Sequence, residues 1–327
     1  MRRKFILFTT LLVVALVSGV VVAEAQQRTK LPRIGVLLPT PTGVKTYLVS
    51  FRQGLEELGY IEGRNIVIEY RIADGKPDQY PGLAAELVNL KVDLIVTGST
   101  PATQAVKNAT KTVPIIMAAA DPLGAGLVTS LAQPGGNITG LSMRSSEFIG
   151  KRLELLKEVV PRVHRVGILW NPLNASNAVS LKESQVVAQA MGLKLQSIEV
   201  QDPSDFNNGF GALTKGRTDA FTVLRDPFIM VHYKRIVELV AKSRLPAVYE
   251  GKEFVLAGGL MSYGASLENL FRRAATYVDK ILKGANPGEL PVEQPMQAEF
   301  IINLKAAKEI GLTIPPEKLI LADKVFN

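Results

Sequence analysis

Two hydroxyl side chains, Ser99 and Thr100, follow an apolar, β-branched run and Gly98. Pro101 and a segment of good helix formers come next, which predicts that a strand passes into a helix here. The first N–H groups of a helix lack partners within the helix and lie at the positive end of its dipole. A carboxylate or phosphate can bind there. The same two residues also suit a purely structural N-cap, which needs one hydroxyl.

Carboxylates and amides follow other predicted strands. Asp226 and Glu250 could each hold an ammonium group, or could serve as a helix cap or a rim charge. Asp121 stands before a proline, which is also typical of a helix N-terminus. Asn171 and Asn174 suit an amide contact with a ligand and equally suit turns.

No pattern typical of catalysis accompanies these residues. The two histidines fit no metal-binding spacing, and no nucleophile elbow, P-loop or dinucleotide-binding glycine motif occurs. The absence of cysteine excludes disulfides, thiolate chemistry, Cys-based zinc sites and a lipid on an N-terminal cysteine. We therefore expect no catalytic residue, no metal and no cofactor. An enzyme that uses carboxylates alone would leave no motif, so that alternative stays open.

Strands that alternate with helices must position the candidate residues. In the first half of the chain, apolar runs predict strands at 31–38, 65–70, 93–97 and 113–119, and an apolar stripe predicts a helix over 44–58. This alternation indicates a parallel sheet covered by helices on both faces.

The second half of the chain repeats the order of the first. Ordered matches of this kind favour duplication of a lobe over the general likeness of any two α/β lobes. The matching segments are 33–37 with 165–169, Gly59 with Gly192, 92–97 with 218–223, and 113–116 with 245–248.

Two such lobes would face each other across a cleft. Ligands of open parallel sheets bind outside the carboxyl ends of the strands, so the side chains at those ends are the candidates. The fold class expected is α/β, with two doubly wound parallel-sheet lobes. The candidate ligand-binding residues are Thr40, Thr42, Ser99, Thr100, Asp121, Asn171, Asn174, Asp226 and Glu250.

The N-terminus has the form of an export signal. Basic residues at 2–4 precede a nearly uninterrupted apolar run over 5–22, and Ala23-Glu24-Ala25 forms an A-x-A cleavage site. An uncleaved anchor is the alternative, since the run approaches the length of a membrane span. The basic start also resembles a twin-arginine signal, although the strongly apolar core favours the general secretory route. We expect residues 1–25 to be removed after Ala25 and the protein to reside in the periplasm without a lipid.

Positive charge is spread along the chain. The net charge is +8, yet no run of five or more basic residues occurs and aromatic residues do not alternate with them. Such charges are typical of solvated helix faces, so no nucleic-acid partner is expected.

Five stretches together resemble one known family. They are 51–60, 97–105, 121–128, 134–140 and 258–264. The chain is similar to the periplasmic substrate-binding proteins of ABC transporters with the type I fold, and within these to the family that includes tryptophan and phenylalanine binders. The resemblance covers essentially the whole mature chain.

The resemblance implies a function without catalysis. A small ligand would be captured by closure of the lobes, with its carboxylate facing Ser99 and Thr100 and its amine on a carboxylate of the second lobe. The implied partners are this ligand, an amino acid or aromatic acid, and the permease subunits of an ABC importer. The protein would act as a monomer.

The resemblance also implies three crossings of the chain between the lobes. They are expected near 141–144, 257–261 and 290–295, with Gly140 and Gly258-Gly259 as hinge positions. The first lobe would comprise 30–142 and 259–290, and the second lobe 143–258 and 291–327.

Two other classes compete with an importer component. One is a periplasmic ligand-sensing module for a membrane receptor, and the other is a secreted enzyme that depends on carboxylates. A transcription regulator of the same fold would carry an N-terminal helix-turn-helix, and an export signal stands in that place.

The export signal leads to a first prediction. Expression in a bacterial host should yield a periplasmic protein whose first residue is Gln26 and which carries no lipid. Mass spectrometry of the intact periplasmic form checks the mass and the N-terminus. Recovery of the protein with residues 1–25 still attached would contradict cleavage.

Overall fold

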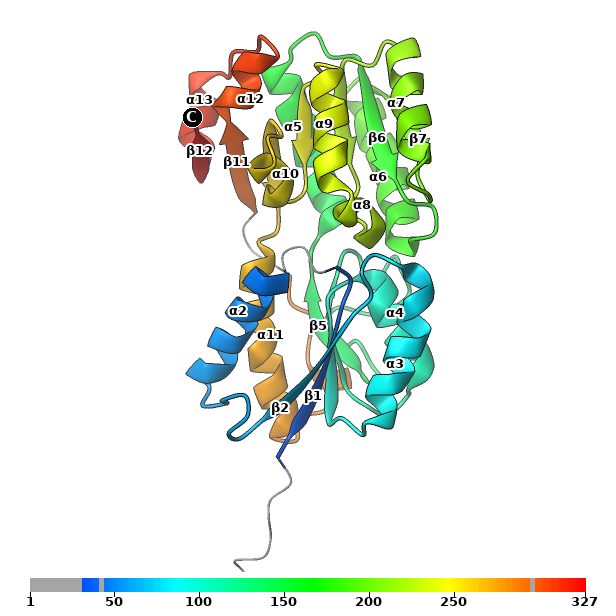
Figure 1. Ribbon diagram of the computed structural model, residues 1–327, viewed down its shortest axis with the longest axis vertical. Helices are drawn as coiled ribbons and strands as arrows, with labels where there is room; N and C mark the ends of the chain where they lie inside the picture. The colour runs from blue at the N-terminus through cyan, green and yellow to red at the C-terminus, as the bar shows by residue number, and fades with distance from the viewer. Residues whose placement is uncertain (1–30, 41–43, 295–297) are drawn as a thin grey trace, which may run out of the picture. The chain divides into compact units, whose positions relative to one another are not determined.

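Two sheets organise the described residues of the computed structural model, which are 31–40, 44–294 and 298–327 (Figure 1). Both sheets belong to the unit Arg33–Asn327, and Met1–Pro32 is a separate unit. The expected export signal over 1–25 and the candidate Thr42 lie outside the described residues. No helix within the described ranges is long and apolar enough to cross a membrane.

The first sheet, within the described residues, holds five strands in the order β2-β1-β3-β4-β5, all of them parallel. The strands are β1 (Arg33–Leu38), β2 (Val67–Ile72), β3 (Leu94–Thr97), β4 (Ile115–Ala119) and β5 (Ile138–Ser142). The α-helices of this lobe are α2 (Val44–Glu57), α3 (Tyr80–Asn89), α4 (Thr100–Ala109) and α11 (Leu267–Leu282). Two short 3-10 helices accompany them, η1 (Pro77–Gln79) and η2 (Pro287–Glu289).

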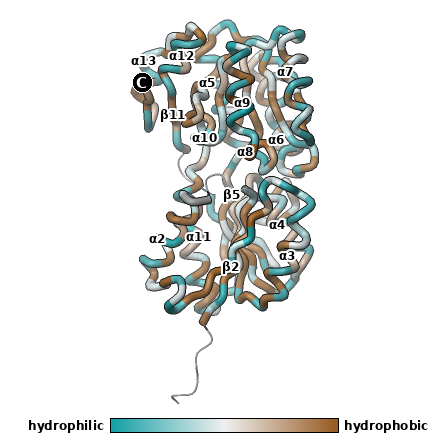
Figure 2. The backbone as a smooth tube through the Cα atoms, viewed as in Figure 1, coloured by the Kyte–Doolittle hydropathy of each residue, from teal (hydrophilic) through white to brown (hydrophobic). Residues whose placement is uncertain are grey.

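Alternation along β1 divides the core of this lobe between the two faces of the sheet. Ile34, Val36 and Leu38 join one buried cluster with the apolar residues of α2 and α11. Leu37 joins a second cluster with the apolar residues of α3 and α4. Hydrophobic residues run along the strands, whereas hydrophobic and hydrophilic residues alternate along the helices (Figure 2). Successive strand residues point to opposite faces, so both helix layers cover a continuous apolar strand.

The second sheet, in the same described ranges, has seven strands in the order β12-β11-β10-β9-β8-β6-β7. These strands are β6 (Arg165–Trp170), β7 (Lys194–Glu199), β8 (Ala220–Val223), β9 (Ala247–Tyr249), β10 (Met261–Gly264), β11 (Glu299–Asn303) and β12 (Lys324–Phe326). The helices are α5 (Ser145–Val159), α6 (Ala175–Ala190), α7 (Asp205–Lys215), α8 (Pro227–Val231), α9 (Tyr233–Lys242), α10 (Lys252–Leu256), α12 (Leu304–Glu309) and α13 (Pro316–Leu321).

The α/β class with a parallel sheet in each of two lobes is therefore confirmed. The second sheet departs from the simple pattern at one pairing, because β11 runs antiparallel to β10. β12 then adds parallel to β11 at the edge.

The chain passes between the two sheets at positions that differ in part from the expected ones. The first passage follows β5 and enters α5 at Ser145. The second lies between β10 and α11, later than the boundary expected at 258–259, because β10 pairs with β9 in the second sheet. Gly258-Gly259 is instead part of the end of α10, where the Gly259 N–H donates to the Phe254 carbonyl at 2.8 Å.

The third passage follows Glu293, whose backbone lies beside β5. Its N–H donates to the Gly140 carbonyl and its carbonyl accepts from the Ser142 N–H, both at 2.9 Å. Residues 291–293 therefore accompany the first sheet, although the second lobe was expected to begin at 291.

The sequence repeat recurs as a repeat of hydrogen bonds. The Arg33 N–H donates to Asp93 Oδ2 at 2.7 Å, and the Arg165 N–H donates to Asp219 Oδ2 at 2.8 Å. Each of the two lobes thus uses an aspartate to fix the start of its first strand beside its third.

Gly140 in β5 is required by both its conformation and its surroundings. Its φ is +133°, and a Cβ there would lie 2.3 Å from the Met117 carbonyl oxygen of the neighbouring strand. A side chain therefore meets backbone atoms that can move only if the sheet distorts.

Gly140→Ala should lower the free energy of unfolding by about 3 kcal/mol, from the forbidden conformation and the clash together. Gly82→Ala is the matched control, since Gly82 is exposed in α3 with nothing within 4 Å of the added carbon. That change should stabilise by up to about 1 kcal/mol. Urea unfolding monitored by circular dichroism measures both, and equal effects would refute the close approach at Gly140.

Candidate ligand-binding cleft

Residues of both lobes line a cavity at the carboxyl ends of the strands. Most of the wall is apolar, and the polar groups are few. The lining residues are Leu38, Pro39, Thr40, Tyr47, Gly98, Ser99, Thr100, Ala120, Met143, Asn174, Arg225, Asp226, Pro227, Met230, Leu267 and Phe271.

Ser99 and Thr100 lie in this wall with their hydroxyls already acting as acceptors. Ser99 is the N-cap of α4, and its Oγ accepts from the Ala102 N–H at 3.2 Å. Thr100 Oγ1 accepts from the Ala120 N–H at 3.3 Å. Because both hydroxyls accept in these bonds, the O–H of each remains a donor. The structure therefore combines the two interpretations of this pair, since Ser99 caps the helix and both residues line the cavity.

The backbone of α4 offers fewer donors to a ligand than the sequence predicted. The second residue of the helix is Pro101, which has no N–H. The next two N–H groups, of Ala102 and Thr103, donate to the side chain and the carbonyl of Ser99. The two hydroxyls therefore supply donors at this side of the cleft that Pro101, Ala102 and Thr103 do not.

Asp226 is buried in the wall and held by four donors. Its Oδ1 accepts from Asn171 Nδ2 at 3.0 Å and from the N–H groups of Phe228 and Ile229, so that it caps α8. Its Oδ2 accepts from Asn174 Nδ2 at 2.9 Å. Burial raises the pKa of Asp226, and these hydrogen bonds act against that rise. Two lone pairs on Oδ2 leave room for one more donor, such as an ammonium group.

The two asparagines therefore bind a carboxylate of the protein. Asn174 lines the cavity and caps α6, because its Oδ1 accepts from the Ser176 N–H. Asn171 does not line the cavity, and its Oδ1 closes a turn by accepting from the Leu173 N–H. Both amides fix Asp226 in place.

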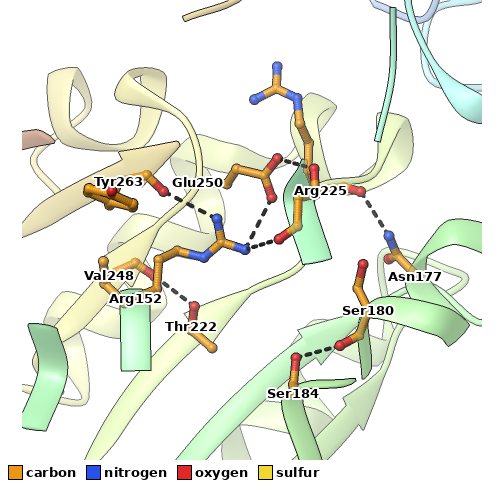
Figure 3. A network of polar contacts seen from close by, with 10 residues as sticks. Arg152, Asn177, Ser180, Ser184, Thr222, Arg225, Val248, Glu250 and Tyr263 are labelled. Carbon is orange, nitrogen blue, oxygen red and sulfur yellow. Dashed lines mark hydrogen bonds and ion pairs between the residues drawn. The ribbon is translucent and has the colours of Figure 1, made fainter. Parts of the chain in front are cut away.

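Glu250 lies away from the cavity wall, in a buried ion pair (Figure 3). Its Oε2 is 3.4 Å from Nη2 of Arg152, which is fully buried, and its Oε1 accepts from Ser145 Oγ at 2.5 Å. Arg152 also donates to the carbonyls of Ser145 and Tyr263, both at 3.2 Å. Burial lowers the pKa of Arg152, and the charge of Glu250 opposes this. Glu250 thus compensates a structural cation, where the sequence suggested contact with a ligand.

Of the two other candidates that the structure describes, one lines the cavity and the other does not. Thr40 lines the cavity and is buried. Asp121 does not line it, and its Oδ1 accepts from the Gly124 N–H at 3.1 Å, so it stabilises a turn.

Arg225 lines the cavity and was not among the candidates. Its side chain is 13% exposed, and its Nη2 lies 3.7 Å from Glu253 Oε1 of α10. Glu253 in turn accepts a hydrogen bond from the Tyr47 hydroxyl, which comes from α2 of the other lobe. Although burial acts against it, the pKa of Arg225 is raised by the charge of Glu253. When the third strands of the two lobes are aligned, with Asp93 opposite Asp219, Arg225 falls opposite Ser99. This alignment was the signal in the sequence that could have identified Arg225 as a candidate.

The apolar wall was also missed. Tyr47 stacks on Phe271 with ring centroids 5.7 Å apart, and Leu267 lines the cavity beside them. Tyr47 belongs to a helical stripe that looks like ordinary core, and Phe271 comes from distant α11. No group of three or more potential metal ligands occurs among the described residues.

Comparison with known proteins gives a consistent result. A family model described as "ABC transporter substrate binding protein" matches residues 40–326. A tyrosine-binding protein of Clostridioides difficile (strain R20291) is 31% identical over 264 residues, which cover 80% of this chain and 76% of that protein.

Solved structures show the same similarity. A conserved domain protein from Vibrio cholerae is 31% identical with a TM-score of 0.86, covering 90% of this chain and all of that one. A domain from Streptococcus pneumonia in complex with L-Trp is 29% identical with a TM-score of 0.84, covering 91% of this chain and 100% of that chain. A ligand-free, open substrate-binding protein from Clostridium difficile is 27% identical with a TM-score of 0.68, again covering 91% and 100%.

The Arg152–Glu250 pair should matter more for stability than a surface pair on the same helix. Glu250→Gln leaves a buried guanidinium without a counter-charge and should lower the free energy of unfolding by about 3–5 kcal/mol. Glu154→Gln removes the exposed partner of Lys151 in α5 and should cost less than about 1 kcal/mol. Urea unfolding of both variants measures the difference. A loss as small for Glu250→Gln as for Glu154→Gln would mean that the carbonyl contacts alone compensate Arg152.

Proposed function

This chain belongs to the ABC transporter substrate-binding protein family, and we propose that it captures an amino acid with an apolar or aromatic side chain for an ABC importer. The family is extracytoplasmic and binds small molecules without transforming them. The observation that carries the proposal is one cavity that joins Ser99, Thr100 and Asp226 to a mostly apolar wall.

The polar groups of the cavity match the two ends of an amino acid. The hydroxyls of Ser99 and Thr100 donate to the ligand carboxylate. Asp226 Oδ2 accepts from the ligand ammonium, since it has a free lone pair and its carboxylate is already fixed by Asn171 and Asn174. Thr40 and Asn174 complete the polar part of the wall.

The apolar part of the wall accepts the ligand side chain. Tyr47, Phe271, Leu267, Met143 and Met230 supply aromatic and flexible apolar surface. Such surfaces favour flat or bulky apolar groups. Two relatives, one named as tyrosine-binding and one solved with L-Trp, support an aromatic amino acid as the ligand.

Delivery of the ligand requires further partners. The protein, exported and freed of residues 1–25, acts as a periplasmic monomer and docks on the permease subunits of an ABC importer. Co-purification with a membrane permease in the presence of ligand tests this part of the proposal. Retention of labelled ligand by cells that lack the permease would point to sensing.

The ligand proposal is tested by a matched pair of threonine variants at the two ends of α4. Thr100→Ala removes a donor to the carboxylate and should weaken binding of the best amino acid about ten- to a hundredfold. Thr110→Ala removes a buried hydroxyl that accepts from the N–H groups of Thr112 and Val113, remote from the cavity. It should lower stability by about 1 kcal/mol and leave affinity unchanged.

A thermal-shift screen of the amino acids identifies the ligand, and calorimetry gives the dissociation constants. Affinity that is unchanged in Thr100→Ala, together with a lower melting temperature, would show that Thr100 is only structural.

A further inference from the structure

The proposed ligand brings a negative charge into a mostly apolar cavity. Burying a carboxylate without a nearby cation is strongly unfavourable. Ser99 and Thr100 are neutral, and the N–H groups of Ala102 and Thr103 already have partners. Among the described residues that line the cavity, Arg225 alone carries a positive charge.

Arg225 is not required to neutralise its neighbour Asp226. That carboxylate takes four hydrogen bonds, two from the asparagine amides and two from the backbone of α8. The guanidinium of Arg225 therefore has a role other than compensating this charge. Its five N–H donors match the planar geometry of a carboxylate.

Contacts to the Arg225 backbone, to its guanidinium and to the neighbouring Glu253 together position this side chain at the cavity. The Arg225 carbonyl accepts from Asn177 Nδ2 at 2.8 Å, which fixes the backbone. Its side chain then extends away from the buried Arg152–Glu250 pair (Figure 3). Glu253 lies 3.7 Å from it, close enough to attract the charge but too far for a direct hydrogen bond. The Glu253 carboxylate is itself held by the Tyr47 hydroxyl.

Gly251 supplies the space in which the guanidinium lies. A Cβ at this position would be 2.8 Å from Arg225 Nη1 and 2.2 Å from Glu253 Oε2. Both are the ends of flexible side chains, so a methyl group would displace them without breaking the backbone. The glycine thus keeps the charged pair in its present position.

We propose that Arg225 is the specificity-determining residue of the cleft, where its guanidinium pairs with the ligand carboxylate and Glu253, held by Tyr47, positions it. The ligand carboxylate is then bound by the charge of the second lobe as well as by the hydroxyls of the first. This rests on the proposed capture of a carboxylate-bearing ligand. The inference adds the residue that makes the protein bind amino acids more tightly than amines that lack a carboxylate.

The experiment compares acids with amines of the same ring. L-Tryptophan and L-tyrosine are titrated beside tryptamine and tyramine, which keep the ring and the ammonium group but lack the carboxylate. Arg225→Gln should weaken binding of the amino acids about ten- to a hundredfold and change binding of the amines less than about threefold. Arg235→Gln, at a half-buried arginine of α9 that packs on Phe206 and does not line the cavity, should change neither.

Two further variants test the positioning of Arg225 without removing it. Tyr47→Phe keeps the ring that stacks on Phe271 and removes only the hydroxyl that holds Glu253. Gly251→Ala displaces the guanidinium and the carboxylate together. Each variant should weaken binding of the amino acids about three- to tenfold and leave binding of the amines unchanged. Arg225→Lys keeps the charge and should recover part of the loss. Loss of acid and amine binding in equal measure would show a merely structural role.

The outcomes separate the inference from the proposed function. If the two aromatic amino acids fail to bind but indole-3-acetate, L-leucine or L-glutamate binds in an Arg225-dependent way, the aromatic ligand is wrong and the role of Arg225 stands. If tryptophan or tyrosine binds and Arg225→Gln leaves the ratio of acid to amine affinity unchanged, the function stands and the inference is overturned. Tighter binding of tryptamine than of tryptophan by the unaltered protein, or no binding by any of these acids, would also overturn it.

Discussion

The buried contact between Arg152 and Glu250 holds together the part of the second lobe that lies beside the cavity. Arg152 reaches the carbonyl of Ser145, where the chain has just entered the lobe, and that of Tyr263, just before it leaves. Glu250 ends the strand next to β8, from which Arg225 follows. An unpaired charge at this depth would be unfavourable, so the pair constrains two passages of the chain and the adjacent strand ends together.

Pairing of buried charges also fixes the side chains that line the cleft. Every buried charge that borders it has a partner from another element, as Asp226 has the two asparagine amides and Arg225 has Glu253. The charged groups that line the cavity are therefore held in place by the protein itself, and such preorganisation reduces the ordering cost of binding. The bond from Tyr47 to Glu253 extends this network from the second lobe to the first.

The two lobes have equivalent strand ends that carry different chemistry. Ser99, Thr100 and Pro101 in the first lobe correspond to 225–227 in the second, where Arg225 and Asp226 precede Pro227. The shared backbone, a strand that turns through a proline into a helix, places both sets at the cavity. One set offers neutral hydroxyls and the other offers charges, so the two lobes bring complementary groups to one cavity.

The sequence by itself determined the fold class and several residues of the cavity wall, because strand period, helix stripe and strand-end position are local properties. Ser99, Thr100 and Asp226 were found this way, and each lines the cavity. It could not decide which strand-end carboxylate faces a ligand, since Asp226 and Glu250 look alike until the buried Arg152 is seen beside Glu250. Only tertiary structure brought the Tyr47–Phe271 wall to the cavity, because those rings come from helices far apart in the chain and meet through packing alone.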